Sequence, residues 1–452
     1  MPQQPLSSYN SGAMTVSTDV TYRCQLNRTR AFTASAVLLL ICLGATLLSG
    51  CGLQSGSDTI AFLQGKTLWA INPDGSSPRK LAQGNIVSVA WSPDHHQYII
   101  RVAQRMTTPP PLSPLGVPDA PGDLYVGSVS GGTPIQITPN LAGLSRSDAW
   151  WNASGNRLLY RESFTGAGPA AATYIVAQAD QPVGIARKPI PVNFGIPVLS
   201  PDGSQVATTD SAGDVQVGEP NAIGKIVATG AVLTLPGTNR PARLLWQPHH
   251  DALLYIASGA DVSSSLELVS LSGAKRTLGQ VSGLLDLAFS PDGSRLLLRT
   301  KQGFTIWSVA HPGQVVFSWD EADPAALPWW SPAGGRILVQ DSVGWRLVDI
   351  AAQRVTTLIT FPGAPLADIS SVSGWHPAAG SPWNVTGDRF IFVAQSRAVW
   401  QGKALSASGN GTTGLYIADP SSGDAPHLIA SGDDRAPTWS YLDPSTTFLV
   451  MA

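Results

Sequence analysis

The feature that most constrains the fold is a short motif that returns along the chain. FSPDGSRLLLRT (289–300) has weaker copies that begin at Trp91, Leu199 and Trp330. In each copy an apolar strand is expected to end at the first residue of the motif. Ser-Pro-Asp-Gly then forms a tight turn, because Pro presets φ and Gly tolerates the last turn position. A second apolar strand follows, so the chain repeats one strand–turn–strand unit.

The period of the repeat is typical of one architecture. Eight units align on the residue before the turn, at intervals of 41 to 64 residues, beginning at Trp91, Trp151, Leu199, Trp246, Phe289, Trp330, Trp375 and Trp439. Each unit continues with a third and a fourth short strand, such as 304–310 and 275–279. A period in the forties with four short strands is the signature of a β-propeller blade. The sequence predicts an all-β propeller of four-stranded blades, eight by this alignment.

The eighth unit is split between the two ends of the repeat array. Residues 59–65, 67–75 and 79–84 form strands that lack a leading aromatic strand, and 436–442 and 446–452 supply further strands. Pairing of these ends in one blade would close the ring and leave no free sheet edge. The two ends supply one strand more than a blade needs, so seven blades with irregular insertions stay open as the alternative.

The units resemble the TolB-type, WD40-like propeller repeat. TLWAINPDGSSPRKLAQG (67–84) followed by VAWSPD (89–94) is similar to that family's succession of a strand, Asp-Gly, a basic residue and Trp-Ser-Pro-Asp-Gly. The resemblance covers about 59–452 but is uneven, since half of the units have lost part of Ser-Pro-Asp-Gly. Family members are periplasmic or surface binding platforms, or noncatalytic gates in front of a peptidase. The resemblance therefore implies a noncatalytic binding role.

The N-terminal segment is typical of a secretory signal. Three arginines precede the apolar run 31–48. Leu48-Ser49-Gly50-Cys51 then resembles the bacterial lipobox, in which the Cys sulfur receives a diacylglyceryl group and a peptidase cuts before the Cys. This resemblance implies lipidation of Cys51 and cleavage between Gly50 and Cys51. Two or more acyl chains give a stable membrane anchor.

These assignments predict a signal peptide with its lipobox at 1–50, the lipidated Cys and a polar tether at 51–58, and the propeller at 59–452. An uncleaved transmembrane helix is the alternative for the apolar run, since 18 apolar residues are just long enough to span a bilayer. Both alternatives place the repeats outside the cytoplasm. The expected location is a bacterial cell membrane or outer membrane, with the propeller on the extracytoplasmic side.

Composition argues against several classes of function. Charged residues are 13% of the chain, the formal net charge is −2 and no run of Lys or Arg occurs, so a nucleic-acid partner is not expected. All three cysteines lie at or before Cys51, which excludes a disulfide or a Cys-based metal site in the repeats. His95-His96 and His249-His250 occupy turn positions, so no metal and no cofactor is predicted. Gly-x-Ser-x-Gly and phosphate-binding loops do not occur.

One alternative to a binding role stays open. An enzyme centred on the propeller channel, a hydrolase or lyase acting on a sugar or lactone, would need carboxylates that converge from the inner strands. Those strands are nearly uncharged, with Asp286 as the exception and Asp148 and Asp368 as weaker ones. We therefore predict a noncatalytic platform, anchored to the membrane, for an envelope protein or a glycan.

Loops that interrupt the repeat are the candidate binding surface, because function tends to lie on such loops. The Pro-rich segment 105–123 and the segment 396–414 occupy the same place between two strands of their units. The second carries Trp400 and Lys403, and Trp383 lies in an insertion of the other loop type. The candidate binding residues from sequence are Trp383, Trp400 and Lys403.

Overall fold

The structure is a computed structural model of the chain. Its described residues all lie within one compact unit, residues 55–452. It describes residues 59–439 except for 65–66, 93–95, 104–121, 140–143, 147–148, 153–154, 165–172, 180–187, 191–196, 203, 210–214, 221–225, 234–242, 250, 259–262, 322, 324–325, 362–380, 396–397, 406–412 and 432–433.

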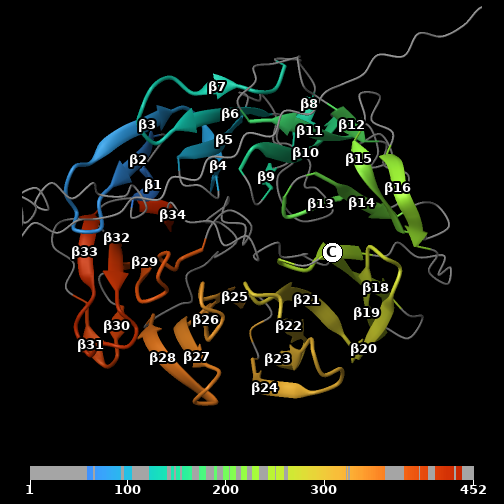
Figure 1. Cartoon of the computed structure of the whole chain (residues 1–452). Helices are drawn as coiled ribbons and strands as arrows, with labels where there is room; N and C mark the ends of the chain where they lie inside the picture. Colours follow the sequence, from blue (N-terminus) through green and yellow to red (C-terminus); the bar gives the residue numbers. More distant parts are fainter. Residues whose placement is uncertain are drawn as a thin grey trace, which may run out of the picture. The chain divides into compact units, whose positions relative to one another are not determined.

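Every regular element among these described residues is a β-strand. The strands pair into eight antiparallel sheets that follow one another around a ring (Figure 1). Seven of the sheets contain at least four strands, and one contains three strands with an additional bridge between Trp383 and Phe390. The predicted all-β propeller is confirmed.

The sheets are numbered here in the order of the ring. Sheet 1 contains β34 (Asp434–Trp439), β1 (Ile60–Gln64), β2 (Thr67–Ile71) and β3 (Arg79–Gln83). Sheet 2 contains β4 (Ile86–Trp91), β5 (Gln97–Ala103), β6 (Gly122–Ser128) and β7 (Ile135–Gln136). Sheet 3 contains β8 (Leu144–Arg146), β9 (Trp150–Trp151), β10 (Arg157–Phe164), β11 (Thr173–Gln178) and β12 (Lys188–Ile190). Sheet 4 contains β13 (Val198–Leu199), β14 (Val206–Thr209), β15 (Val215–Pro220) and β16 (Ile226–Leu233).

The other half of the ring has the same plan. Sheet 5 contains β17 (Arg243–Trp246), β18 (Ala252–Ser258), β19 (Ser263–Ser270) and β20 (Lys275–Ser282). Sheet 6 contains β21 (Leu284–Phe289), β22 (Arg295–Thr300), β23 (Gly303–Ser308) and β24 (Val315–Asp320). Sheet 7 contains β25 (Leu327–Trp330), β26 (Arg336–Asp341), β27 (Gly344–Asp349), β28 (Arg354–Thr360), β30 (Val399–Trp400) and β31 (Lys403–Ala404). Sheet 8 contains β29 (Phe390–Gln395), β32 (Thr413–Ala418) and β33 (His427–Ser431).

The ring is closed by strands from both ends of the repeat array. β34 pairs with β1 in antiparallel register, with Ile60 opposite Trp439 and Ala61 opposite Thr438. Figure 1 shows the red β34 beside the blue β1. The predicted closure is confirmed for residues 436–439 of the strand predicted at 436–442, and residues 440–442 and the strand predicted at 446–452 lie outside the described residues. Because the two ends share one sheet, opening the ring requires breaking a backbone ladder.

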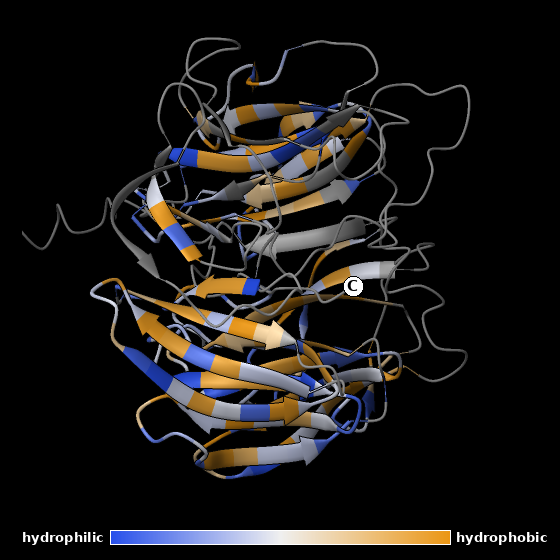
Figure 2. Cartoon of the chain, turned by 90° about the vertical axis from the view of Figure 1, so that its right-hand side faces the viewer, coloured by the Kyte–Doolittle hydropathy of each residue, from blue (hydrophilic) through white to orange (hydrophobic). Residues whose placement is uncertain are grey.

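The core lies between neighbouring sheets. In β21 the side chain of Leu287 joins a buried cluster with sheet 5, and the next residue, Ala288, joins a buried cluster with sheet 7. Successive strand residues point to opposite faces, so both faces of an inner strand are covered. This explains the continuous apolar runs in the sequence, which Figure 2 shows as orange bands along the strands.

The turn after each inner strand has one recurring hydrogen-bond pattern. In six units the residue after the inner-strand aromatic or Leu is Ser or Asn, and its side-chain oxygen accepts the backbone N–H five residues later at 2.8 to 3.1 Å. Four of these turns place a glycine at φ between 66° and 70°, a left-handed conformation that favours glycine. These glycines are Gly155, Gly293, Gly334 and Gly387.

The Asp of Ser-Pro-Asp-Gly belongs to the same pattern. Asp202 accepts hydrogen bonds from the hydroxyls of Ser200 (2.6 Å) and Ser204 (2.7 Å), and Asp292 is held in the same way by two serines. These hydrogen bonds lower the pKa of Asp202 below its ordinary value. The motif therefore recurs because it fixes the turn. The acceptor sites of its carboxylate are used by the hydrogen bonds of the turn.

The seventh complete unit corrects the sequence alignment. Its predicted start, Trp375, lies outside the described residues, and Trp383 takes the inner aromatic position. The indole Nε1 of Trp383 donates to the carbonyl of Trp329 at 3.2 Å, as the indole of Trp246 donates to Val198 at 3.1 Å. In both pairs the acceptor lies on the inner strand of the preceding sheet. WNVTGDR (383–389) matches WNASGNR, the third-sheet copy that begins at Trp151, so a sequence signal for this alignment existed.

The turn carboxylate gives a test of this pattern. Asp202→Ala removes the acceptor for two hydroxyls and a backbone N–H, and we expect the free energy of unfolding at pH 7 to fall by about 1 kcal/mol. Because the folded pKa is lowered, this contribution is present above pH 4 and is lost as pH falls through the folded value. Urea unfolding at pH 7 and at pH 3 measures both effects.

Asp320→Ala is the matched control, since this exposed carboxylate ends β24 and should change stability by less than about 0.5 kcal/mol. Equal urea midpoints for Asp202→Ala and the unmodified chain at pH 7 would show that the aspartate does not fix the turn.

Candidate functional site

Of the three candidate binding residues from sequence, two are buried and one is exposed. The indoles of Trp383 and Trp400 are 0% and 1% exposed, and Lys403 is exposed. The prediction of Trp383 and Trp400 as surface binding residues is wrong, because both rings belong to one buried aromatic cluster. The cluster also contains Trp329, Trp345, Phe390, Phe392 and Tyr416.

The segment that carries Trp400 is an added hairpin and not a free rim loop. β30 and β31 form a two-stranded hairpin, and β30 pairs with the end of β28, so a segment between two strands of sheet 8 extends sheet 7. Trp400 stacks on Phe392 of sheet 8 with ring centroids 6.2 Å apart and an interplanar angle of 4°. The hairpin therefore joins two sheets, and Lys403 is the residue of the three that stays available to a ligand.

Other candidate positions fall outside the described residues. These are the lipidation and cleavage residues Gly50 and Cys51, the carboxylates Asp148 and Asp368, and most of the Pro-rich segment 105–123. Within the described part of the chain, no three His, Cys, Asp or Glu side chains lie close enough together to hold a metal ion. In the same part, no helix is long and apolar enough to cross a membrane.

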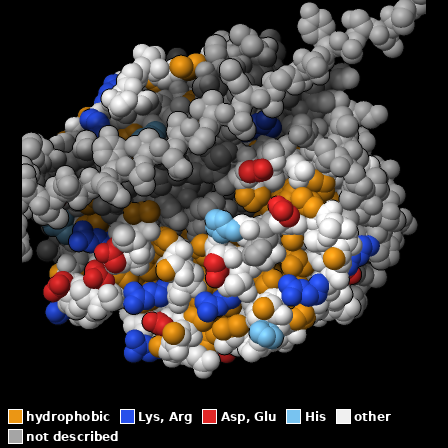
Figure 3. All heavy atoms as spheres, in the orientation of Figure 1, with side chains coloured by type: hydrophobic (Ala, Val, Ile, Leu, Met, Phe, Trp, Pro, Cys, Tyr) orange, Lys and Arg blue, Asp and Glu red, His pale blue; other side chains and the backbone are white. Residues whose placement is uncertain are grey.

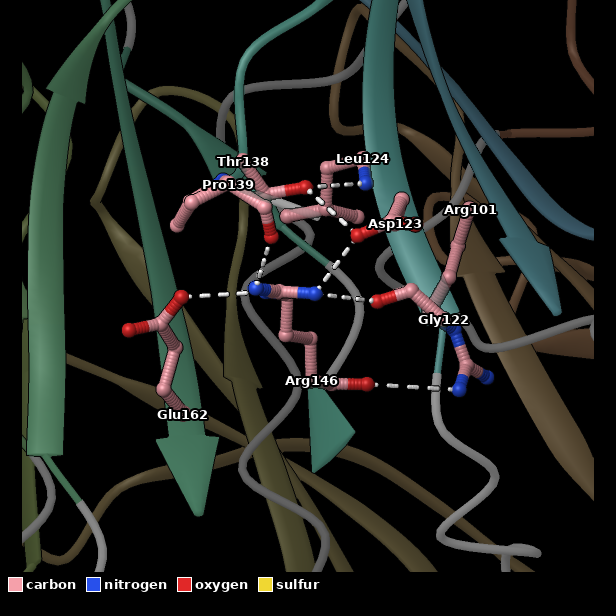
Figure 4. Close-up of polar contacts among 8 residues, drawn as sticks. All are labelled: Arg101, Gly122, Asp123, Leu124, Thr138, Pro139, Arg146 and Glu162. Atoms are coloured by element: carbon pink, nitrogen blue, oxygen red, sulfur yellow. Dashed lines mark hydrogen bonds and ion pairs between the residues drawn. The ribbon is translucent and has the colours of Figure 1, made fainter. Parts of the chain in front are cut away.

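A buried ion-pair network joins sheets 2 and 3 (Figure 4). The guanidinium of Arg146, at the end of β8, is 0% exposed and binds Asp123 Oδ1 at 2.7 Å and Glu162 Oε1 at 3.0 Å. It also donates to the carbonyls of Gly122 (2.9 Å) and Pro139 (2.6 Å). Four of its five N–H donors are thus used.

This network is a structural one. Arg101 donates to the backbone carbonyl of Arg146 at 3.3 Å, and the side chain of Arg146 pairs with the carboxylates of Asp123 and Glu162. Asp123 is further bonded by the hydroxyl of Thr138 at 3.3 Å. The guanidinium of Arg146 has its charge balanced and almost all its donors occupied, which leaves it little capacity for a ligand. Its role is to hold two sheets together.

A second charged cluster lies at the start of the inner strands of sheets 5 and 6. Arg243 and Asp286 both stand three residues before the inner aromatic of their sheet, and Arg299 lies directly opposite Asp286 in the β21–β22 register. Arg299 takes the register position in sheet 6 that Arg101 takes in sheet 2, where Arg101 is opposite Ser88. The same inner-strand position is uncharged in sheets 2 and 7, where it is Ser88 and Leu327, and is Asp148 in the unit of Trp151.

The second cluster differs from the first in its hydrogen bonding. The Nη1 atom of Arg243 is buried and has no hydrogen-bond partner. Asp286 is 6% exposed, and its Oδ1 accepts the backbone N–H of Leu287 at 2.8 Å. Both arginines act electrostatically on the Asp286 carboxyl, yet neither forms a hydrogen bond or a close ion pair with it in the described structure.

Burial dominates the ionisation of Asp286. Removal from water raises its pKa to about 7, although the backbone N–H of Leu287 and the charges of Arg299 and Arg243 act to lower it. Burial also lowers the pKa of both arginines, and the carboxylate of Asp286 opposes that shift. Near neutral pH the cluster therefore contains two guanidinium groups and a carboxyl that can gain or lose a proton.

The carboxylates near Arg299 have hydrogen-bond or ion-pair partners of their own. Arg346 forms an ion pair with Glu321 at 2.9 Å and a second with Asp341, and Asp323 accepts the backbone N–H of Ser342 at 2.6 Å. Glu321 and Asp323 act on Arg299 only through their charge. On the described part of the face in Figure 3, cationic and acidic side chains are intermixed with apolar ones. The buried Nη1 of Arg243, which has no hydrogen-bond partner, is what sets the second cluster apart.

Sequence reasoning identified Asp286 but missed both arginines and Arg146. The signal for Arg243 was its place three residues before the inner aromatic, where Ser88 and Leu327 stand in two other units. Arg299 did not stand out in the sequence, because Arg101 and Arg161 also lie ten residues after the inner aromatic of their units. Arg146 had no such signal, because its partners come from β6 and β10 and from the carbonyl of Pro139.

Comparison with known proteins supports the fold but identifies no family for the chain. No protein-family model and no curated protein sequence matches the chain. A solved eukaryotic initiation factor is similar in structure, with 11% identity and a TM-score of 0.51 over 85% of this chain and 99% of that one. The C-terminal WD40 domain of Sif2 (12% identity, TM-score 0.48, 74% and 89% covered) and an oligogalacturonate lyase in complex with manganese (13%, 0.42, 60% and 78%) are also similar. At such identities the likeness shows the β-propeller fold alone.

Removal of Arg146 should be strongly destabilising. Arg146→Ala leaves the carboxylates of Asp123 and Glu162 buried without their cation, and we expect a loss of roughly 3–5 kcal/mol in the free energy of unfolding. Arg146→Lys should also destabilise the protein, since one ammonium group lacks the planar fork that reaches four acceptors. Arg354→Ala, at an exposed position of β28, is the control. Similar urea midpoints for Arg146→Ala and Arg354→Ala would contradict the role of the network.

Ionisation of Asp286 should lower the free energy of unfolding as pH rises. Its folded pKa lies above its unfolded value, so its contribution to stability is complete below pH 4 and is lost as pH rises through about 7. Asp286→Asn cannot ionise, so its stability relative to the unmodified chain should improve by roughly 2–3 kcal/mol between pH 5 and pH 8. Denaturant unfolding at both pH values measures the difference, and a constant difference would show that Asp286 does not titrate in this range.

Proposed function

We propose that the chain is an extracytoplasmic lipoprotein, anchored by lipid on Cys51, whose β-propeller is a noncatalytic platform that binds a protein or glycan of the bacterial cell envelope. The observation that carries the proposal is the sequence Leu48-Ser49-Gly50-Cys51 at the end of an arginine-preceded apolar run. Such a run followed by this motif resembles a lipoprotein signal, and the propeller begins shortly after it.

The length of the tether supports a platform held near the membrane. Residues 52–59 separate Cys51 from β1, and eight extended residues reach at most roughly 28 Å. A ligand bound on the propeller would then be kept within about one domain diameter of the lipid surface. This arrangement suits the capture of a partner that is itself part of the envelope.

Closure of the ring supports the same role. β1 follows the tether and pairs with β34, so a pull on the anchor acts on a strand that belongs to a complete four-stranded sheet. The anchor is thus attached to a backbone ladder rather than to a fraying end. A platform that is tethered at one point and loaded by a partner needs this kind of attachment.

A channel-centred hydrolase or lyase is the second candidate, and one observation favours it. Asp286 is a buried carboxyl with a pKa of about 7, a value suited to general acid or base catalysis. Such an enzyme needs further groups that converge on the same site, and Asp148 and Asp368 lie outside the described residues. The two arginines whose charges act on Asp286, one of them with a buried Nη1 that has no partner, fit binding of a charged group directly, so the platform is the preferred proposal.

The anchor is tested by Cys51→Ser in a bacterial host that processes lipoproteins. The unmodified chain should incorporate labelled palmitate and sediment with membranes, whereas Cys51→Ser should incorporate none. Cys42→Ser is the matched control, because it changes a cysteine of the apolar run and leaves the lipobox-like motif intact. Palmitate incorporation by Cys51→Ser equal to that of the control would refute the proposed anchor.

The platform is tested by cross-linking in the same cells. The lipidated chain should recover a reproducible envelope protein, or a glycan, in near-equal amount by mass spectrometry, and Cys51→Ser should recover less of it because the chain is no longer held beside its partner. Recovery of the lipidated chain alone in repeated experiments would count against a platform and in favour of the enzyme.

A further inference from the structure

A buried arginine donor without a partner is an unusual polar feature of the described structure. A buried guanidinium N–H that forms no hydrogen bond costs free energy, so such groups are normally paired. Arg146 shows the normal case, with contacts to two carboxylates and two carbonyls. Arg243 has a buried Nη1 with no hydrogen-bond partner, and the partly exposed guanidinium of Arg299 is affected by the charges of Asp286, Asp323 and Glu321.

The placement of these arginines is set by the repeat. Arg243 is the first residue of β17 and Asp286 the third residue of β21, so both stand at one level of adjacent inner strands, while Arg299 faces Asp286 from β22. Leu245 of β17 and Leu287 of β21 share one buried cluster, which fixes the two inner strands against each other. The three charged groups are therefore held by packed strands, and ligand-binding groups on such elements are preorganised.

We propose that Arg243, Asp286 and Arg299 form a binding site for an oxyanion group, a carboxylate or a phosphate or sulfate ester, of a ligand of this propeller. The guanidinium fork matches such groups and binds them in a bidentate manner. Arg243 and Arg299 are both partly exposed, so a ligand can reach them, and Asp286 lies buried behind them. The inference deepens the proposed binding function by naming the chemistry of the ligand, and it rests on that function.

Binding of an oxyanion at this site should depend on whether the carboxyl of Asp286 is protonated. A carboxylate at Asp286 competes with a bound oxyanion for the two guanidinium groups, whereas a protonated Asp286 can donate a hydrogen bond to it. Arg243, Arg299 and, through Arg299, the charges of Glu321 and Asp323 are the ionisable groups that face this carboxyl. Oxyanion binding should therefore be accompanied by proton uptake near pH 7.

The test uses the full chain purified from detergent-solubilised whole cells, with sulfate and acetate as probes because neither titrates between pH 6 and pH 8. Thermal unfolding midpoints are measured against probe concentration at constant ionic strength, with chloride as the balancing anion. A saturable rise that exceeds the chloride effect is expected for the unmodified chain. The affinity should fall about tenfold from pH 6 to pH 8, since one proton is taken up per oxyanion.

Three variants and one control variant separate the contributions. Arg243→Gln and Arg299→Gln should each weaken the affinity at least tenfold, while Arg354→Gln, at an exposed position of β28, should leave it unchanged. Asp286→Asn should bind with an affinity that no longer depends on pH and should take up no proton. Circular dichroism of each variant without probe establishes that it is folded.

The outcomes decide between the proposals. Equal affinities of the unmodified chain, Arg243→Gln and Arg299→Gln, or no saturable effect of either probe, would overturn the oxyanion site. Saturation by sulfate but not acetate assigns the site to phosphate or sulfate esters, and the reverse assigns it to carboxylates. Membrane anchoring is scored separately by palmitate on Cys51, so a failed oxyanion site would leave the anchor standing, and a failed anchor would not alter binding in detergent.

Discussion

Packing of each sheet against the next is the interaction on which the rest of this structure depends. An inner strand such as β21 sends Leu287 toward one neighbouring sheet and Ala288 toward the other, so each sheet is stable only as part of the ring. The indole N–H of an inner tryptophan adds a directional link, since Trp246 and Trp383 each donate to a backbone carbonyl of the preceding sheet. The β34–β1 pairing extends this dependence to the ends, because an open ring would leave one face of two sheets exposed.

The turn motif follows from the same constraint. Short inner strands must reverse quickly to stay in the ring, and a Ser or Asn oxygen that accepts the N–H five residues later ends each strand at a fixed residue. Because the pattern is local, it is visible in the sequence, and the all-β propeller and its closure could be predicted from it. The alignment failed at Trp375, where Trp-His-Pro imitates the motif, while Trp383-Asn384 carries the side-chain oxygen and the glycine that the turn requires.

Contacts between sheets were harder to foresee than contacts within a unit. The hairpin that contains Trp400 and Lys403 has no repeat counterpart, and its pairing with β28 depends on where the preceding sheet lies in space. An aromatic residue in an insertion looks the same in sequence whether it packs in the core or faces solvent, so Trp400 was expected at the surface. The contacts of Arg146 were equally hard to foresee from the sequence. Its carboxylate partners lie on β6 and β10, and only the folded ring brings them together.

Arg243, Asp286 and Arg299 place three charged groups on two adjacent sheets, and one buried donor among them has no partner. The buried arginine of sheet 3, Arg146, has four of its donors occupied by contrast. A buried guanidinium N–H without a partner reduces the free energy of unfolding. Burial of Asp286 also reduces it once the carboxyl ionises, and the raised pKa of about 7 reflects this destabilisation. Departures from local consistency are expected where a site serves a ligand rather than the fold. A bound oxyanion would supply the partners that the chain itself does not, and the energy lost in the free protein would be regained on binding.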